Sequence, residues 1–420
     1  MAAMMFGAMR SPRNLVFGAG QRASLPRYAR ELGSHALVVT DERLAEDGQF
    51  KQMMAGLAEA GVRATIYSGT VAELPAACIT DGLKVGQAAG VDLVIGIGGG
   101  SCMDAAKVIA LLLSHGGQPS DYFGEFKVPG PITPLIAVPT TAGTGSEVTP
   151  VAVISDPEKA VKVGIASPHL IPTTSICDPE LTYSCPPGLT AASGADALTH
   201  AIEAYTTLAR DIGGDISHEH VFLGKNAISD QFALAAIGHI AASLKAACDN
   251  GDDRIARERL MYGAMLAGLA FGVAGTAAAH AVQYPVGALT HSPHGVGVAV
   301  MMPYVMAFNL DAATQPLAEI GVAMGVAGAD MDARSAAMLA IEAVAKLFAS
   351  IGIPENLAAL GLAEDKLGWT AEAALGATRL VKNNPRPLDL ASMTLLVECA
   401  FRGDRHALQN SESELKGELN

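Results

Sequence analysis

Asp196 and His200 lie four residues apart in an apolar run whose composition predicts a helix over residues 189–207. Residues at positions i and i+4 of a helix project from one face, so the carboxylate and the imidazole are expected side by side. Both groups are common ligands of divalent metals. Small residues such as Gly194 and Ala197 flank them and predict a buried helix, in which a carboxylate needs a partner.

Two histidines farther along the chain could complete such a site. His280 follows three alanines in a predicted helix over residues 276–288, and His294 stands in Ser292-Pro-His-Gly-Val-Gly297, a pattern typical of a glycine-rich turn. One aspartate with three histidines suits Fe²⁺ or Zn²⁺ and leaves room for a substrate oxygen. The nearest alternative to His294 is His291, and an ordinary surface contact is the alternative for the first pair.

A second group of candidate residues indicates nucleotide binding. Gly96-Ile-Gly-Gly-Gly-Ser101 follows a predicted strand and begins a predicted helix, where backbone N–H groups favour a phosphate. The usual dinucleotide fold carries its acidic ribose ligand about 20 residues after this loop. Here the candidate is Asp41, before the loop, which indicates a different topology and favours NAD over NADP; a helix N-cap is the alternative. Pro139 to Glu147, rich in threonine and glycine, supplies further donors.

The elements that would hold these residues change in kind near Pro186. Before it, short apolar strands (36–40, 63–67, 92–97 and 135–138) alternate with helices (46–60, 76–89 and 101–113), which predicts an α/β domain with a parallel sheet over residues 1–185. After it we expect an all-helical domain, residues 186–420, with an irregular insertion at 209–224. Its predicted helices are 189–207, 228–248, 252–271, 276–288, 312–325, 334–351, 366–380 and 388–402.

Composition excludes several classes of protein. The 420 residues carry a net charge of −14, which argues against a nucleic-acid or anionic-membrane partner. The six cysteines form no CxxC pair, no apolar run reaches the length of a membrane span, and the N-terminus lacks the pattern of a secretory signal. We therefore expect a cytoplasmic protein, and its 50% hydrophobic residues favour a homodimer or larger homo-oligomer.

These motifs together resemble the iron-containing (group III) alcohol dehydrogenases. The resemblance rests on Gly98-Gly-Gly-Ser-Cys-Met-Asp-Ala-Ala-Lys107, Pro139 to Thr149, Gly194-Ala-Asp-Ala-Leu-Thr-His-Ala-Ile-Glu203, Asn226-Ala-Ile-Ser-Asp230, His280, His294-Gly295 and Asn384-Pro-Arg386. It implies an N-terminal dinucleotide-binding α/β domain, dehydroquinate synthase-like, a helical metal domain, and an active site in the cleft between them.

The resemblance also implies roles for single residues. The metal ligands would be Asp196, His200, His280 and His294, and Phe271 would lie near the substrate. Tyr284 occupies the position where many members have a second histidine with a proposed part in proton transfer, and a phenol could serve instead. The cofactor would be bound by Asp41, Gly98, Gly99, Gly100, Ser101, Asp104, Thr140, Thr141, Thr144, Thr149, Val151, Lys162 and Leu181.

The resulting hypothesis is an NAD(H)-linked, metal-dependent alcohol dehydrogenase or aldehyde reductase for a small substrate, with one divalent ion, Fe²⁺ rather than Zn²⁺. One alternative is a hydroxyacid–oxoacid transhydrogenase with tightly held NAD. Another is a dehydroquinate synthase-like lyase, which needs basic residues around a phosphorylated substrate; the helical half has few near the predicted ligands. A non-enzymatic helical assembly protein is disfavoured, because nothing structural requires four ligand-type residues together.

Overall fold

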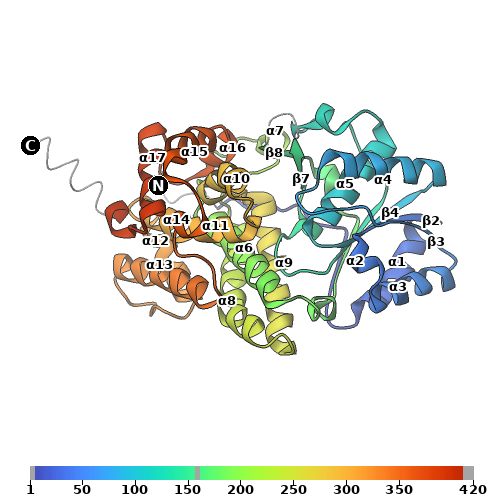
Figure 1. Cartoon of the computed structure of the whole chain (residues 1–420), viewed down its shortest axis with the longest axis horizontal. Helices are drawn as coiled ribbons and strands as arrows, with labels where there is room; N and C mark the ends of the chain where they lie inside the picture. Colours follow the sequence, from blue (N-terminus) through green and yellow to red (C-terminus); the bar gives the residue numbers. More distant parts are fainter. Residues whose placement is uncertain (1–4, 157–160, 410–420) are drawn as a thin grey trace, which may run out of the picture. The chain divides into compact units, whose positions relative to one another are not determined.

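The computed structural model describes residues 5–156 and 161–409 and divides into two compact units (Figure 1). The first comprises Met9–Cys185 and Gly213–Phe222; the second comprises the described parts of Met1–Ala8, Pro186–Ile212 and Leu223–Asn420. Most of the predicted insertion therefore packs with the first unit, where Arg10 donates to the carbonyl oxygen of Val221.

The first unit is built on a six-stranded parallel sheet in the order β1-β9-β6-β4-β2-β3. The four predicted strands are confirmed as β2 (His35–Val39), β3 (Arg63–Tyr67), β4 (Leu93–Gly98) and β6 (Leu135–Pro139). The other two strands, β1 (Asn14–Phe17) and β9 (Thr174–Cys177), were not predicted, because each is only four residues long and lacks a purely apolar run.

Helices cover both faces of this sheet. They are α1 (Leu25–Leu32), α2 (Glu42–Ala45), α3 (Gly48–Glu59), α4 (Ala76–Ala89) and α5 (Gly100–His115). Strand β2 shows how the two cores form: Leu37 and Val39 pack with residues of α4 and α5, whereas Ala36 and Val38 pack with residues of α1 and α3. Because alternate strand residues point to opposite faces, an unbroken apolar strand is buried on both.

A smaller sheet of three strands was not predicted. It consists of β5 (Gly124–Glu125), β8 (Val161–Ala166) and β7 (Val151–Asp156), in that order, with β7 and β8 antiparallel. Strand β7 directly follows the threonine-rich run, so this sheet fixes where that run ends. Short 3₁₀ helices lie at Gln21–Ser24, Pro119–Tyr122, Ser146–Val148, Pro168–Leu170, Pro179–Thr182 and, in the second unit, Glu364–Lys366.

The second unit is helical, as predicted, and no strand occurs among its described residues. Its helices are α6 (Pro187–Thr206), α8 (Ala227–Asp249), α9 (Arg254–Ala274), α10 (Ala278–Thr290), α11 (His294–Phe308), α12 (Thr314–Ala323), α13 (Ala333–Ser350), α14 (Leu357–Leu360), α15 (Leu367–Leu375), α16 (Thr378–Asn383) and α17 (Leu390–Arg402); α7 (Ile216–Glu219) belongs to the first unit. The predicted helix 366–380 is wrong as one element, since α15 ends before Gly376 and α16 begins two residues later.

One helix of the described chain, α8, is long and apolar enough to cross a membrane, and α9 with α10 would also pass that test if the bend of 102° between them were ignored. Helix α8 packs against both α6 and α9.

Candidate functional site

Three of the four predicted metal ligands, the histidines, converge on one atom of the fourth, Oδ1 of Asp196. Its distances to the Nε2 atoms of His200, His280 and His294 are 3.6, 3.7 and 3.9 Å. The ligand atoms of Asp196, His280 and His294 all lie within 4.8 Å of one another. Metal bonds of about 2.1 Å place neighbouring ligand atoms roughly 3.0–3.5 Å apart, so small movements would accommodate one divalent ion.

Two buried atoms of this cluster support a cation. Oδ1 of Asp196 and Nε2 of His280 have no hydrogen-bond partner within the described residues. Buried polar atoms are nearly always partnered, and a shared metal ion would satisfy both. His294 is the least buried of the set, with 26% of its side chain exposed. The alternative, His291, is instead the exposed C-cap of α10.

Electrostatics also favour a cation. Burial acts to raise the pKa of the Asp196 carboxyl, but the three imidazoles outweigh it and hold that pKa well below its usual range. Burial acts to lower the pKa of His280, but the carboxylates of Glu203 and Asp196 raise it to about 9. The cluster therefore concentrates negative charge and proton affinity at the point where the ligand atoms meet. A metal ion can replace that proton, since histidine binds metals in its neutral form.

Glu203 is a functional candidate to which the sequence had assigned no role. Its Oε2 lies 2.6 Å from Nδ1 of His280 and accepts from the backbone N–H of Ala277 at 2.9 Å, while Oε1 accepts from the N–H of Ala279 at 2.7 Å. A carboxylate on Nδ1 leaves Nε2 to face a metal and orients the ring. Its spacing of seven residues from Asp196 on one helix was the available signal.

The prediction of a glycine-rich turn at His294 is wrong, because His294 is the first residue of α11. A Cβ on Gly295 would lie 2.2 Å from the carbonyl oxygen of Ala192 on α6, and one on Gly297 would lie 1.6 Å from Oε1 of Gln283 on α10. These glycines therefore serve close packing of three helices and not a turn. That packing brings the histidine to the Asp196 carboxylate.

Two aromatic rings lie beside the cluster. The Phe271 ring, buried near the end of α9, stacks on His200 with centroids 4.2 Å apart and an interplanar angle of 17°. The Tyr284 ring lies 6.5 Å from that of His294 and one helical turn after His280. Burial raises the pKa of the Tyr284 phenol, and the positive charge of Arg379 partly opposes this. The structure thus places both predicted residues at the cluster, while their catalytic roles stay predictions.

The glycine-rich run lies at the carboxyl end of the sheet in the first unit. Gly99 is the N-cap of α5. Because no side chain caps this end of the helix, the backbone N–H groups of its first turn are available to an anion. Asp41 follows the neighbouring strand β2 and reaches the same edge. Its Oδ1 accepts from the N–H of Leu44 at 2.8 Å, so the N-cap alternative is correct for that oxygen. Oδ2 is not part of that bond.

The four predicted threonines differ in accessibility. Thr141 and Thr144 are half-buried, and a Cβ on Gly100 would lie 2.7 Å from Cγ2 of Thr144. Thr140 and Thr149 are buried. Thr141 and Thr144 are therefore the better candidates for direct contact with a phosphate at the glycine turn.

Two of the remaining predicted cofactor residues, Asp104 and Lys162, have polar partners inside the protein. Asp104 accepts from Oγ of Ser146 at 2.6 Å, and Lys162 forms an ion pair with Glu73 at 2.7 Å. Val151 is half-buried at the start of β7, and Leu181 is buried in the core beside α1 and α3. Ser101 is half-buried in the first turn of α5, and Gly98, at a φ of +152°, lies directly before the N-cap.

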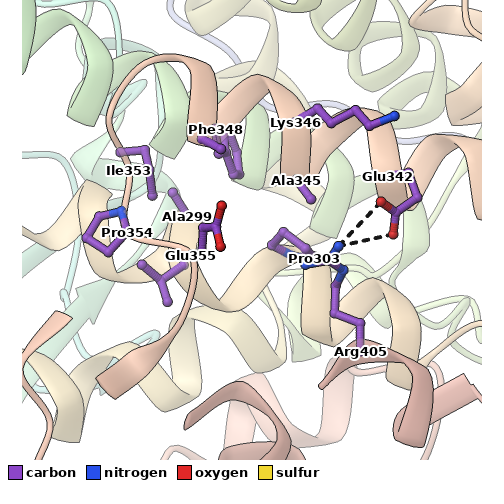
Figure 2. A pocket seen from close by; sticks show the side chains of 12 residues that line it. Ala299, Pro303, Glu342, Ala345, Lys346, Phe348, Ile353, Pro354, Glu355 and Arg405 are labelled. Atoms are coloured by element: carbon purple, nitrogen blue, oxygen red, sulfur yellow. Dashed lines mark hydrogen bonds and ion pairs between the residues drawn. The ribbon is translucent and has the colours of Figure 1, made fainter. Parts of the chain in front are cut away.

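A separate hollow of about 150 Å³ lies in the helical unit, between α11, α13 and the segment that follows α13 (Figure 2). Apolar residues such as Ala299, Pro303 and Phe348 form much of its wall. At one side Arg405 pairs with Glu342 at 3.1 Å. No predicted site residue lines it, so it is distinct from the metal cluster.

Comparison with known proteins gives the same assignment for both halves of the chain. The family model for iron-containing alcohol dehydrogenase matches residues 12–179, and the C-terminal model of the Fe-containing alcohol dehydrogenase family matches residues 190–401. Long-chain-alcohol dehydrogenase 1 of Geobacillus thermodenitrificans is 36% identical over 382 residues, covering 90% of this chain and 92% of the relative. The 1,3-propanediol dehydrogenase of Citrobacter freundii is 38% identical over 345 residues, covering 82% and 85%.

Solved structures agree with these relatives. The crystal structure of a 1,3-propanediol oxidoreductase superposes with a TM-score of 0.88 at 34% identity, covering 94% of this chain and all of the other. An alcohol dehydrogenase from Oenococcus oeni gives 0.87 at 31% identity, covering 94% and 100%. The chain therefore belongs to the iron-containing alcohol dehydrogenase family.

Proposed function

We propose that this protein is a metal-dependent, NAD(H)-linked alcohol dehydrogenase or aldehyde reductase that acts on a short alcohol or aldehyde. The convergence of His200, His280 and His294 on one oxygen of Asp196 carries the proposal. Family membership supports the reaction class. The names of relatives support the cofactor, since one is an NAD-dependent methanol dehydrogenase from Bacillus methanolicus, 34% identical.

Asp196 and the three histidines would hold the ion, which when bound would supply Lewis-acid polarisation of the substrate oxygen during hydride exchange with the nicotinamide. Glu203 accepts the Nδ1 proton of His280 and so keeps Nε2 directed at Asp196. Phe271 covers one face of His200 and excludes water from it. The glycine turn at the start of α5 would bind the pyrophosphate.

Tyr284 would exchange the hydroxyl proton of the substrate. Its ring lies beside that of His294, and the phenol is both a donor and an acceptor. The phenol is protonated at neutral pH, and burial, which raises its pKa, keeps it so, which leaves a proton to donate to a product oxygen in the direction of aldehyde reduction.

We propose a short substrate because the aromatic rings of Phe271 and Tyr284 take up space beside the cluster. Relatives are named for substrates of different lengths, including 1,3-propanediol, lactaldehyde and long-chain alcohols. The proposal favours the first two kinds. We further propose a cytoplasmic homo-oligomer, from the composition alone.

The test is NADH consumption by protein reconstituted separately with Fe²⁺, with Zn²⁺ and with no metal. Acetaldehyde, lactaldehyde, 3-hydroxypropanal and decanal form the substrate panel. We expect turnover that requires metal and is greatest for the short aldehydes. His280→Ala should lose both bound metal and turnover, whereas His239→Ala on α8, whose ring packs on Tyr262, should keep both. The proposal would be refuted if metal-loaded protein failed to oxidise NADH with every aldehyde of the panel.

A further inference from the structure

One stripe of α5 follows the threonine-rich loop along its whole length. Gly100, Asp104 and Lys107 are spaced i, i+4 and i+7, so they lie on one face of the helix. All three face the segment 144–153, with Gly100 against Thr144, and with Asp104 and Lys107 bonded to residues between 146 and 153. Asp104 and Lys107 belong to the first unit, whereas the metal cluster belongs to the second.

Asp104 holds the middle and the end of this segment. Its Oδ1 accepts from Oγ of Ser146 at 2.6 Å, and its Oδ2 accepts from the backbone N–H of Val153 at 2.9 Å. Both carboxylate oxygens are thus used inside the protein. Asp104, predicted among the cofactor residues, therefore binds the loop that is expected to contact the cofactor.

Lys107 binds the C-terminal end of the loop, at Thr149 and Val151. Its fully buried ammonium donates to the carbonyl oxygen of Thr149 at 2.9 Å, to Oγ1 of Thr149 at 3.2 Å and to the carbonyl oxygen of Val151 at 2.7 Å. Three donors therefore meet three acceptors, with the Asp104 carboxylate 4.0 Å away. A buried lysine is tolerated only with such complete pairing.

The N-terminal end of the loop is hydrogen-bonded to the glycine turn, because the N–H of Thr140 donates to the carbonyl oxygen of Gly98 at 3.0 Å. Thr141 and Thr144 lie between the two anchors and against Gly99 and Gly100. We propose that Asp104 and Lys107 are positioning residues for the cofactor: they hold the loop so that Thr141 and Thr144 meet a dinucleotide pyrophosphate bound at the start of α5. This inference rests on the proposed NAD(H)-linked function.

The charge on Lys107 gives the proposal a distinctive signature. Asp104 faces it from α5 and Glu147 from the loop, and Lys162 on β8 acts on Asp104. Burial lowers the pKa of Lys107 to about 8, against the opposing effect of the two carboxylates. Above that pH the neutral amine has two N–H donors for three oxygens, so the loop loses one anchor. Burial also raises the pKa of Glu147, to about 7, so its change precedes that of Lys107.

The experiment measures NADH binding by fluorescence titration of metal-loaded protein between pH 7.5 and 9.5, with no substrate present. We expect the Kd of the wild type to rise several-fold across this range. Lys107→Met should weaken binding about tenfold at pH 7.5 and abolish the pH dependence, with metal content unchanged. Lys107→Arg keeps the charge and should remove the pH dependence with less loss of affinity. Lys84→Met, which removes an exposed lysine of α4, is the control.

The outcomes separate this inference from the proposed function. If the wild type binds NADH and Lys107→Met binds it equally well with the same pH dependence, the positioning role is wrong and the proposed function stands. If the metal-loaded wild type binds no NADH, both are wrong. Should Lys107→Met fail to fold, Ser146→Ala replaces it, since it removes only the hydroxyl that Asp104 accepts from. An unchanged Kd for Ser146→Ala would then overturn the proposal.

Discussion

Replacing Gly295 with alanine tests whether helix packing alone creates the metal centre. The added methyl carbon would lie 2.2 Å from the carbonyl oxygen of Ala192 and 3.1 Å from Cβ of Asp196. The nearest obstacle is backbone and cannot rotate away. Helices α6 and α11 must therefore separate by about 1.2 Å, the difference between 2.2 Å and an ordinary contact near 3.4 Å.

That separation acts on the metal site more than on the fold. His294 directly precedes Gly295, so its Nε2 would move away from Oδ1 of Asp196, now 3.9 Å distant. Metal bonds tolerate only about 0.2 Å of displacement. We expect metal affinity to fall about 100-fold or more, as when a ligand loses its support. The free energy of unfolding should fall by about 1–3 kcal/mol, the usual cost of overpacking.

The assay compares bound metal after dialysis against a graded chelator, together with the melting temperature with and without added Zn²⁺. Gly188→Ala in α6 is the matched control, because a Cβ there meets nothing within 4 Å. It should keep its metal and be unchanged or slightly stabilised. A Gly295→Ala protein that retained stoichiometric metal at wild-type affinity would refute the argument that close packing positions His294.

Three further predictions concern single side chains. Glu203→Gln, which weakens the acceptor on Nδ1 of His280, should lower metal affinity about 10–100-fold in a chelator competition. The same change at exposed Glu258 should leave metal affinity unchanged. If Glu203→Gln bound metal as tightly as the wild type, Glu203 would have no role in the metal site. Tyr284→Phe should lower kcat about 100-fold with metal content unchanged, and an unaltered kcat would show that another group moves the proton. Asp41→Ala should lower the free energy of unfolding by about 1 kcal/mol through loss of the N-cap. It should also reduce the preference for NADH over NADPH, measured as the ratio of the two Kd values. An unchanged ratio would contradict a contact between Asp41 and the ribose.

Local patterns were sufficient to predict much of the fold. Strand β2 is an unbroken apolar run in which Leu37 faces one core and Val38 the other, so its burial on both faces follows from composition. Strand β9 contains Thr174 and Ser175, and its place in the sheet depends on pairing with β1 and β6. Because that pairing joins residues far apart in sequence, no local pattern indicates it.

The candidate site divides in the same way. The sequence by itself determined that Asp196 and His200 share a helix face, because a spacing of four residues gives that geometry in any α-helix. Only the tertiary structure decided that His280 and His294 reach the same oxygen, and that Gly295 allows α11 to approach α6. Helical periodicity acts over a few residues, whereas contacts between α6, α10 and α11 depend on how three separate helices pack, which no spacing along the chain encodes.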